Sequence, residues 1–330
     1  SFDDVFVPAD AFRQGNLWVW GSNTNLELGN NTGIERSTPV TTFVGGVNWK
    51  TIGSGGQAAI KTDGTLWMWG SNTYGSIGDN TAINKSTPVT TFAGGTNWKQ
   101  VAGASSYTVA IKTDGTLWTW GNNGYGKLAI NSTTGPICTP VTTFVGGTNW
   151  EQVACGSDYT VAIKTDGTLW CWGRNNYGQL GDNTIVHRST PVTTFAGGNN
   201  WKQVSCGSGT AAMTLAIKTD GTLWVWGGNN FRQLGINSNV DKSTPVTTFA
   251  GGTDWKQVSI SNNTSAIKTD GTLWVWGNNF RGALGDNTAI SRSTPVTTFL
   301  GGSNWKQSTC LKTNSNISST FALTYIDDYL

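Results

Sequence analysis

Apolar and polar positions follow a pattern that returns many times along the chain. In residues 161–172 an apolar run is followed by Asp166-Gly167, and then by Leu169, Trp170 and Trp172. Asp-Gly between two short apolar runs indicates a tight hairpin, because glycine accepts the positive φ that such a turn needs. Side chains alternate along a strand, so the two tryptophans share one face and their neighbours the other. Both faces are apolar, and the pattern therefore predicts a hairpin that is covered on both sides.

The Trp-x-Trp pair of this hairpin recurs throughout the chain. Its copies begin at Trp18, Trp67, Trp118, Trp170, Trp224 and Trp274. A spacing of about fifty residues is typical of propeller blades and kelch-like units. Each unit has one further tryptophan after an Asn or Asp, at Trp49, Trp98, Trp150, Trp201, Trp255 and Trp305. These positions account for all 18 tryptophans, so we expect tryptophan to form core before it serves any other purpose.

Each unit offers four strand candidates: Trp-Lys-Gln-Val, Val-Ala-Ile-Lys, Leu-Trp-x-Trp and Pro-Val-Thr-Thr-Phe. The proline that begins the last run favours an edge strand, where a missing N–H costs least. No window shows the apolar spacing and the caps of a helix. We therefore predict an all-β fold, a β-propeller of six four-stranded blades.

The two ends of the chain complement each other. The last unit has the first two strand candidates but no Trp-x-Trp, whereas the first unit has Trp-x-Trp with no tryptophan strand before it. Together they contain one blade, which predicts a ring closed by strands from both termini. We expect residues 1–12 to form an irregular arm and residues 13–330 to form a single six-unit propeller domain. The alternative is seven blades, in which residues 4–12 supply further strands.

Composition narrows the range of partners. Charged residues make up 12% of the chain and the formal net charge is +2, which argues against nucleic acid as a partner. We expect no membrane insertion, because no apolar run reaches the roughly 20 residues that span a bilayer. No secretion signal is recognisable after Ser1. The cysteines have no CxxC spacing, and Cys155, Cys206 and Cys310 share one position of the repeat, so we predict buried, reduced thiols.

Candidates for catalysis and metal binding are few. The single histidine, His187, has no partner at a motif spacing. The aspartate of each Thr-Asp-Gly is explained by the hairpin turn. A second set, Asp79, Asp182 and Asp286, lacks the pattern of a calcium loop, and we favour hydrogen bonding within the loop over calcium. We predict no enzyme, no metal site and no cofactor.

Basic residues precede Ser-Thr-Pro in five of the six units, at Arg36, Lys85, Arg188, Lys242 and Arg292. Radial repetition would turn them into a ring of positive charge that suits an anionic partner. The simpler interpretation, which we favour, is that they are solvated charges that keep the protein soluble.

The candidate ligand-binding residues are aromatic and lie in Asn/Gly-rich loops after Trp-Gly. They are Tyr74, Tyr125, Tyr177, Phe231 and Phe280, with Arg174, Arg232 and Arg281 beside them. Aromatic faces near amides suit sugar rings, which stack on the ring and hydrogen-bond through their hydroxyls. The simpler interpretation, which we favour, is that these aromatic residues only cap the core between blades from one end.

The run Tyr-Thr-Val-Ala-Ile-Lys-Thr-Asp-Gly-Thr-Leu-Trp-x-Trp-Gly, continued by Tyr-Gly-Gln-Leu-Gly-Asp-Asn, resembles the repeat of the regulator of chromosome condensation family. That family has seven blades where this chain has six sets of markers, and its repeats carry a His where this chain has Tyr107 and Tyr159. The exchange activity of eukaryotic members on a small GTPase is not carried over to this chain.

Ser-Thr-Pro-Val-Thr-Thr-Phe and Gly-Gly-x-Asn-Trp-Lys-Gln are more similar to uncharacterised proteins of bacteriophages, marine ones especially. This resemblance implies a virion structural or adhesin protein. Its partners would be other virion proteins and a host-surface glycan or protein, and it would be located in the virion. The alternative is a cytoplasmic scaffold for protein–protein interaction.

Overall fold

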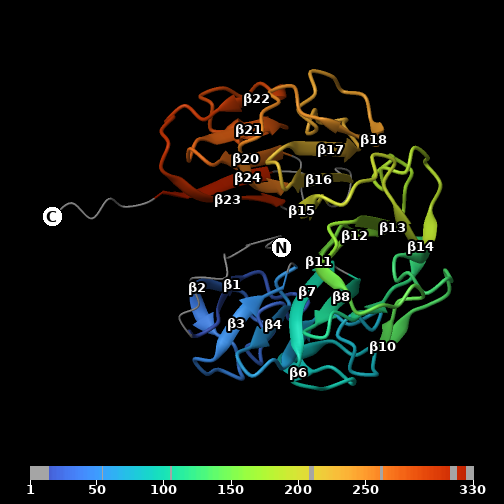
Figure 1. Cartoon of the computed structure of the whole chain (residues 1–330). Helices are drawn as coiled ribbons and strands as arrows, with labels where there is room; N and C mark the ends of the chain where they lie inside the picture. Colours follow the sequence, from blue (N-terminus) through green and yellow to red (C-terminus); the bar gives the residue numbers. More distant parts are fainter. Residues whose placement is uncertain are drawn as a thin grey trace.

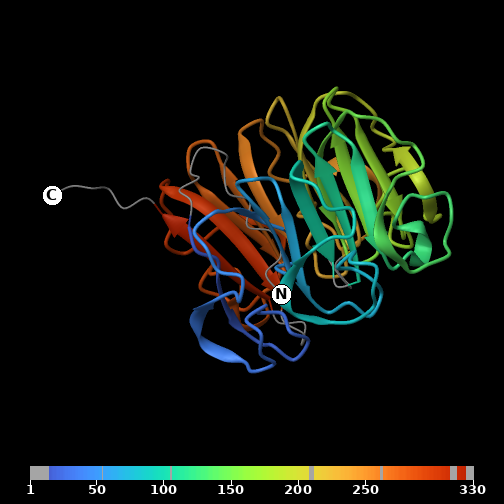
Figure 2. The ribbon, with the colours of Figure 1, turned by 90° about the horizontal axis from the view of Figure 1, so that it is seen from below.

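The computed structural model describes residues 15–53, 55–104, 106–207, 212–260, 263–312 and 318–324. These residues form five antiparallel sheets of four strands and two sheets of two strands. In each complete sheet the strands pair in chain order, so the strand that contains Thr-Pro-Val-Thr forms one edge, as predicted. The sheets follow one another around a ring like blades (Figures 1 and 2). The prediction of an all-β propeller is confirmed.

The strands of the five complete sheets are, in chain order, β3 (Trp49–Ile52), β4 (Ala58–Lys61), β5 (Leu66–Gly70) and β6 (Lys85–Thr90); β7 (Trp98–Ala104), β8 (Tyr107–Lys112), β9 (Leu117–Gly121) and β10 (Ile137–Thr142); β11 (Trp150–Cys155), β12 (Tyr159–Lys164), β13 (Leu169–Gly173) and β14 (Arg188–Thr193); β15 (Trp201–Cys206), β16 (Met213–Lys218), β17 (Leu223–Gly227) and β18 (Lys242–Thr247); β19 (Trp255–Ile260), β20 (Asn263–Lys268), β21 (Leu273–Gly277) and β22 (Arg292–Thr297). The two half-sheets are β1 (Trp18–Gly21) with β2 (Arg36–Thr41), and β23 (Trp305–Lys312) with β24 (Ser318–Thr324). Two short 3-10 turns, η2 (Gly124–Gly126) and η4 (Phe280–Gly282), lie in loops.

The Asp-Gly hairpin joins the second and third strands of each blade. In the blade of β12 and β13, Gly167 has φ +78°, and the N–H of Lys164 donates to Thr168 O at 3.0 Å. This is a turn with a single left-handed glycine. Asp166 Oδ1 accepts the N–H and the hydroxyl of Thr168 at 2.9 and 2.7 Å. A Cβ at Gly167 would lie 2.1 Å from Asn199 O of the next blade, so the glycine is required both by φ and by the neighbouring chain.

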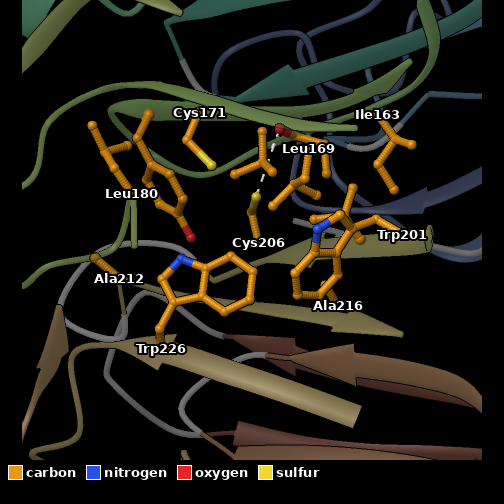
Figure 3. Packing of buried hydrophobic residues seen from close by; sticks show 13 residues of the cluster. Ile163, Leu169, Cys171, Leu180, Trp201, Cys206, Ala212, Ala216 and Trp226 are labelled. Carbon is orange, nitrogen blue, oxygen red and sulfur yellow. Dashed lines mark hydrogen bonds between the residues drawn. The ribbon is translucent and has the colours of Figure 1, made fainter. Parts of the chain in front are cut away.

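The hydrophobic core lies between blades. Figure 3 shows one such layer, in which Leu169 and Cys171 of one blade face Trp201 and Trp226 of the next. The rings of Trp201 and Trp226 meet edge to face with centroids 6.0 Å apart. The indole of Trp226, fully buried, donates to Gln179 O of the preceding blade at 2.9 Å. Both faces of the Trp-x-Trp strand are therefore covered, as the alternation predicted.

The described residues do not form the shared sixth blade that would close the ring. Among the described residues, β24 pairs with β23 and β1 with β2, but the two half-sheets do not pair with each other. Trp20 is 44% exposed and Trp18 is 52% exposed, so the expectation that every tryptophan is core is wrong for the first unit. The half-sheets dock on their own neighbours instead: Trp69 donates to Glu27 O at 2.7 Å, and Thr320 donates to Ala283 O at 2.9 Å.

The surface of the last complete blade that would receive Trp20 is open. A Cβ at Gly285 would meet nothing within 4 Å, whereas a Cβ at the equivalent Gly235 would lie 2.7 Å from Trp276 Nε1. A hollow of about 540 Å³ lies here, lined by Gly285, Asn287 and Phe299 among others. None of the described residues of β1–β2 therefore occupies the position of the outer half of a sixth blade.

Cys155 and Cys206 are buried thiols that form no disulfide, as predicted. Each thiol lies 3.6 Å from a carbonyl oxygen of the preceding blade, Ala102 O and Ala154 O respectively. The side chain of Cys310 and the expected arm of residues 1–12 lie outside the described part of the structure.

Candidate functional site

The predicted binding residues lie in the loops that follow Trp-Gly, which we call the Trp-Gly loops. One buried asparagine organises each loop. Asn175 Nδ2 donates to the carbonyl oxygens of Thr184 at 3.1 Å and Val186 at 3.2 Å, and its Oδ1 accepts the N–H of Leu180 at 2.9 Å. Equivalent bonds are made by Asn23, Asn72, Asn123, Asn229 and Asn279. This role was not predicted, although its signal, Trp-Gly-x-Asn, stands in every unit.

The acidic residues of these loops pair with the basic residues that precede Ser-Thr-Pro. Arg188 Nη2 lies 2.7 Å from Asp182 Oδ2, and Asp182 Oδ1 accepts the Thr184 hydroxyl at 2.7 Å. Burial by itself raises the pKa of Asp182, but the hydrogen bonds from Thr184 and Arg188 outweigh burial and lower it. The same pairing joins Lys85 to Asp79 and Arg292 to Asp286.

These pairs settle two expectations from the sequence. The aspartates serve hydrogen bonding within the loops, as favoured. In three of the five units the basic residue is paired with an aspartate of its own loop. Its charge is neutralised there, so these three residues are neither solvated free charges nor part of a ring of positive charge. Arg36 and Lys242 have Asn30 and Ile236 in the place of the aspartate.

Two of the predicted aromatic residues meet a predicted arginine between neighbouring blades. The guanidinium carbon of Arg174 lies 5.3 Å from the ring centre of Tyr125 and 6.0 Å from that of Tyr177. Tyr125 is 42% exposed, and Arg174 is also partly exposed. A guanidinium over a tyrosine face is attracted by the ring quadrupole. We call this group the Tyr125–Arg174–Tyr177 surface.

A buried ion pair supports this surface from below. Lys127 Nζ lies 2.7 Å from Asp158 Oδ1, while Asp158 Oδ2 lies 3.5 Å from Arg174 Nη1. The Lys127 side chain is only 3% exposed; it also donates to Ser106 Oγ at 3.2 Å and lies over the Tyr107 ring. The role of Asp158 was not predicted, because its partners lie in loops of two different blades.

His187 is part of the same neighbourhood. Its ring meets Tyr125 edge-on, with centroids 4.9 Å apart, and its Nδ1 accepts the N–H of Asn175 at 2.9 Å. Burial and the nearby Arg174 guanidinium lower the pKa of His187, which favours the neutral ring that this bond requires. Asn84, Asp241 and Ser291 supply the equivalent acceptor in other units. His187 therefore supplies the hydrogen-bond acceptor that its own Trp-Gly loop needs for the Asn175 N–H.

The other candidates are not gathered into the same surface. Phe231 and Arg232 line a hollow of about 370 Å³ together with Asn278 and Ser291. Arg232 Nη1 donates to Ser291 O at 3.2 Å, so this arginine bridges two blades. Tyr74 is 45% exposed.

Phe280 does not occupy the position of Tyr177. The buried asparagine of its loop is Asn279, so Phe280 is one residue after it, whereas Tyr177 is two residues after Asn175. Arg281 stands in the position of Tyr177. This offset places the Arg281 guanidinium 5.4 Å from the Phe280 ring within one loop, instead of between two blades.

In the part of the chain that the structure describes, no cluster of three or more His, Cys, Asp or Glu residues is arranged to hold a metal ion. Over the same residues, no helix has the length and apolar character to cross a membrane.

The repeated four-stranded sheets and the recurring Trp-Gly loops define a repeat β-propeller with polar, aromatic-bearing loops at one end of its blades. The model of the RCC1-like domain matches residues 11–316. The chain belongs to this family, and the resemblance to regulator-of-chromosome-condensation repeats is confirmed.

Several relatives carry the same repeat. The chain is 34% identical over 145 residues to the ultraviolet-B receptor UVR8 of Arabidopsis thaliana, which covers 44% of this chain and 32% of the receptor. It is 35% identical over 144 residues to the human E3 ubiquitin-protein ligase HERC2, covering 42% of this chain and 3% of that protein. The match thus spans a third or less of these relatives. Both are RCC1-domain proteins and neither is from a bacteriophage, so the resemblance to phage proteins is not supported.

Solved structures share the fold. Yeast RCC1 (Prp20), solved bound to Kap60, has a TM-score of 0.75 at 17% identity over 96% of this chain and 78% of that chain. Human WBSCR16 has a TM-score of 0.67 at 21% identity, over 82% of this chain and 69% of that chain.

Proposed function

We propose that this propeller is a non-enzymatic protein-interaction scaffold and that its binding site is the Tyr125–Arg174–Tyr177 surface. The observation that carries the proposal is the stacking of Arg174 between tyrosines of two blades, at a partly exposed place. Tyrosine and arginine are enriched among the residues that dominate binding energy at protein interfaces.

The surface is held in place before any partner arrives. Asp158 fixes Arg174 from below and is itself fixed by Lys127, and His187 supports Tyr125 from the side. Binding costs less free energy when interface side chains are already ordered. Pre-ordered aromatic and guanidinium groups are therefore suited to a protein surface that offers acidic and apolar groups side by side.

Protein partners are recorded for a yeast propeller of the same fold. The related yeast protein Prp20 has been solved bound to Kap60, and the interaction properties of Prp20p with Gsp1p and histones are described for that protein. For this chain we propose no particular partner of that kind, because a likeness at 17% identity carries the fold alone.

The test compares the proteins that the immobilised propeller retains with the proteins that an immobilised variant retains. The double variant Tyr125→Ala with Tyr177→Ala should fail to retain proteins that the unchanged chain retains. If the two tyrosines dominate the interface, the affinity should fall by about thirtyfold or more. Tyr74→Ala is the matched control, because Tyr74 is similarly exposed in another Trp-Gly loop, while no cation of the described residues lies over its ring. An unchanged set of retained proteins in the double variant would refute this site.

The alternative function is that of a virion or adhesin protein, which would bind a host-surface glycan instead of a protein through the same tyrosines. A glycan array with Tyr177→Ala as control tests it, and peptide mass spectrometry of virions against soluble lysate tests the location. Glycan binding that is lost in Tyr177→Ala would favour this alternative, and recovery only from the soluble fraction would exclude the virion.

A further inference from the structure

The second residue of every innermost strand is charged. Five of the six are lysines and one is a glutamate: Lys50, Lys99, Glu151, Lys202, Lys256 and Lys306. All six are exposed. The function proposed above makes no use of them, and neither a hairpin turn nor a core position explains a charge there.

The innermost strands bring these positions next to one another. β7, β11 and β15 lie on the side of their sheets that faces the middle of the ring (Figure 1). The side chain of Gln100 spans to the next blade, donating to Val153 O and accepting the Val153 N–H, both at 3.1 Å. Gln257 makes the same two bonds with Ser308. Since each glutamine follows a charged position, consecutive charged positions lie beside each other around the axis.

One contact shows how close the charged groups are. Lys99 Nζ lies 2.8 Å from Glu151 Oε2 of the next blade. A carboxylate at this radius is thus within reach of a lysine of the neighbouring blade. The other four positions carry lysine only, and we call Lys50, Lys202, Lys256 and Lys306 the axial lysines.

The axial lysines lie at the end of the blades opposite the Tyr125–Arg174–Tyr177 surface. Along β11 and β12, Trp150 pairs with Lys164 beside the Asp-Gly turn, so Glu151 belongs to the turn end. At the other end of β12, Tyr159 pairs with Gly173, where the Trp-Gly loop begins. The two surfaces are therefore separated by the length of the strands.

Most other charges at the turn end balance each other; the exception is Asp254, a further carboxylate, which lies 3.1 Å from Lys268 Nζ. Each hairpin brings one exposed aspartate, such as Asp166, and one lysine, such as Lys164, whose Nζ lies 4.7 Å from the ring centre of Trp150 and 4.8 Å from that of Trp170. These pairs belong to the second and third strands, one step further from the axis. Among the described residues, the charges nearest the axis are therefore mainly positive, and those around it are mixed.

We propose that the axial lysines form a second binding surface, for an acidic peptide segment of a protein partner. Glu151 is the internal example, since its carboxylate is held by the lysine of the adjacent blade. Lysine presents a compact charge on a flexible stem, which suits closely spaced carboxylates of an extended segment. The hairpin aspartates around the axis disfavour a wide polyanion such as a nucleic acid duplex, whereas a single peptide chain reaches the axis without meeting them.

The test uses purified full chain and a fluorescein-labelled oligoglutamate peptide, with fluorescence anisotropy at low and physiological salt. Binding should weaken with salt, as screening requires. Lys202→Glu should weaken binding by about fivefold, since it turns one exposed attraction into a repulsion. Glu151→Lys should strengthen binding, because it adds a lysine and releases Lys99. The melting temperature of each variant confirms that it is folded.

Lys242→Glu is the matched control, because it makes the same change of charge on the outermost strand of the blade that carries Lys202. Equal effects of the two substitutions would show that only net charge matters and would overturn the proposal. So would absence of peptide binding, or tighter binding of a single-stranded oligonucleotide of equal charge. Tyr177→Ala should leave oligoglutamate binding unchanged, which separates this surface from the one proposed above.

Discussion

Two ion pairs of almost equal length should differ strongly in their value for stability. Lys127 and Asp158 approach to 2.7 Å with side chains 3% and 26% exposed, whereas Lys99 and Glu151 approach to 2.8 Å with side chains 39% and 52% exposed. Asp158→Asn removes the negative charge and leaves a buried ammonium beside a neutral amide, with Ser106 Oγ and the Tyr107 ring as its other partners. Glu151→Gln leaves Lys99 in water.

The expected costs follow from burial. Removing one partner of a buried pair costs about 3–5 kcal/mol; because Asp158 keeps a quarter of its side chain in water, we expect about 2–3 kcal/mol for Asp158→Asn. An exposed pair contributes about 0.2–1 kcal/mol, so Glu151→Gln should cost less than about 1 kcal/mol. Urea unfolding measures both changes in the free energy of unfolding.

A third variant separates the buried charge from the lost contact. Lys127→Met combined with Asp158→Asn removes both charges and keeps an apolar side chain of similar length, so it should recover at least half of the loss. Equal costs for Asp158→Asn and Glu151→Gln, or no recovery in the double variant, would refute the reasoning from burial.

Three further predictions follow from the blades. Hydrogen bonds and ion pairs lower the pKa of Asp79, Asp182 and Asp286 in the folded chain. The stability that these carboxylates contribute is therefore complete above their unfolded pKa of about 3.9 and is lost as pH falls through their folded pKa values. The melting temperature measured against pH should show this loss, and Asp182→Asn should reduce it. Gly167→Ala places a Cβ 2.1 Å from Asn199 O, whereas Gly197→Ala, also at positive φ, meets nothing within 4 Å; thermal unfolding should show Gly167→Ala as the more damaging, with Gly197→Ala limited to the backbone cost of about 1–2 kcal/mol. Trp226→Ala should lower the free energy of unfolding by about 3–5 kcal/mol, because Trp226 is fully buried. Trp20→Ala should lower it clearly less, because Trp20 is 44% exposed. Equal losses in urea unfolding would mean that β1 and β24 close the ring in solution.

The sequence by itself determined the repeat and most of its local structure. Asp166-Gly167 predicted the hairpin, the alternation of Trp170 and Trp172 predicted a strand covered on both faces, and the proline of Ser-Thr-Pro predicted the edge strand. These features depend on residues close together in the chain, whose φ, ψ and side-chain direction are set by local sterics. Each of these patterns recurs from unit to unit, which made it recognisable, and the same recurrence revealed the aromatic loops and their arginines.

Tertiary structure decided what lies between blades. Lys127 and Asp158 are 31 residues apart and occupy different positions of the repeat, so their meeting depends on how one blade docks on the next and leaves no periodic trace. Lys99 and Glu151 occupy the same position of neighbouring units, 52 residues apart, but only the docking of the blades brings their side chains together. Docking also decides that Arg174 lies over the ring of Tyr125 of the neighbouring blade, whereas the offset of Phe280 by one residue can be read from its distance to Asn279 in the sequence. Closure of the ring is the clearest case, because the pattern supplies the strands of one more blade, while the docking of β1–β2 and β23–β24 on their own neighbours decides whether those strands meet.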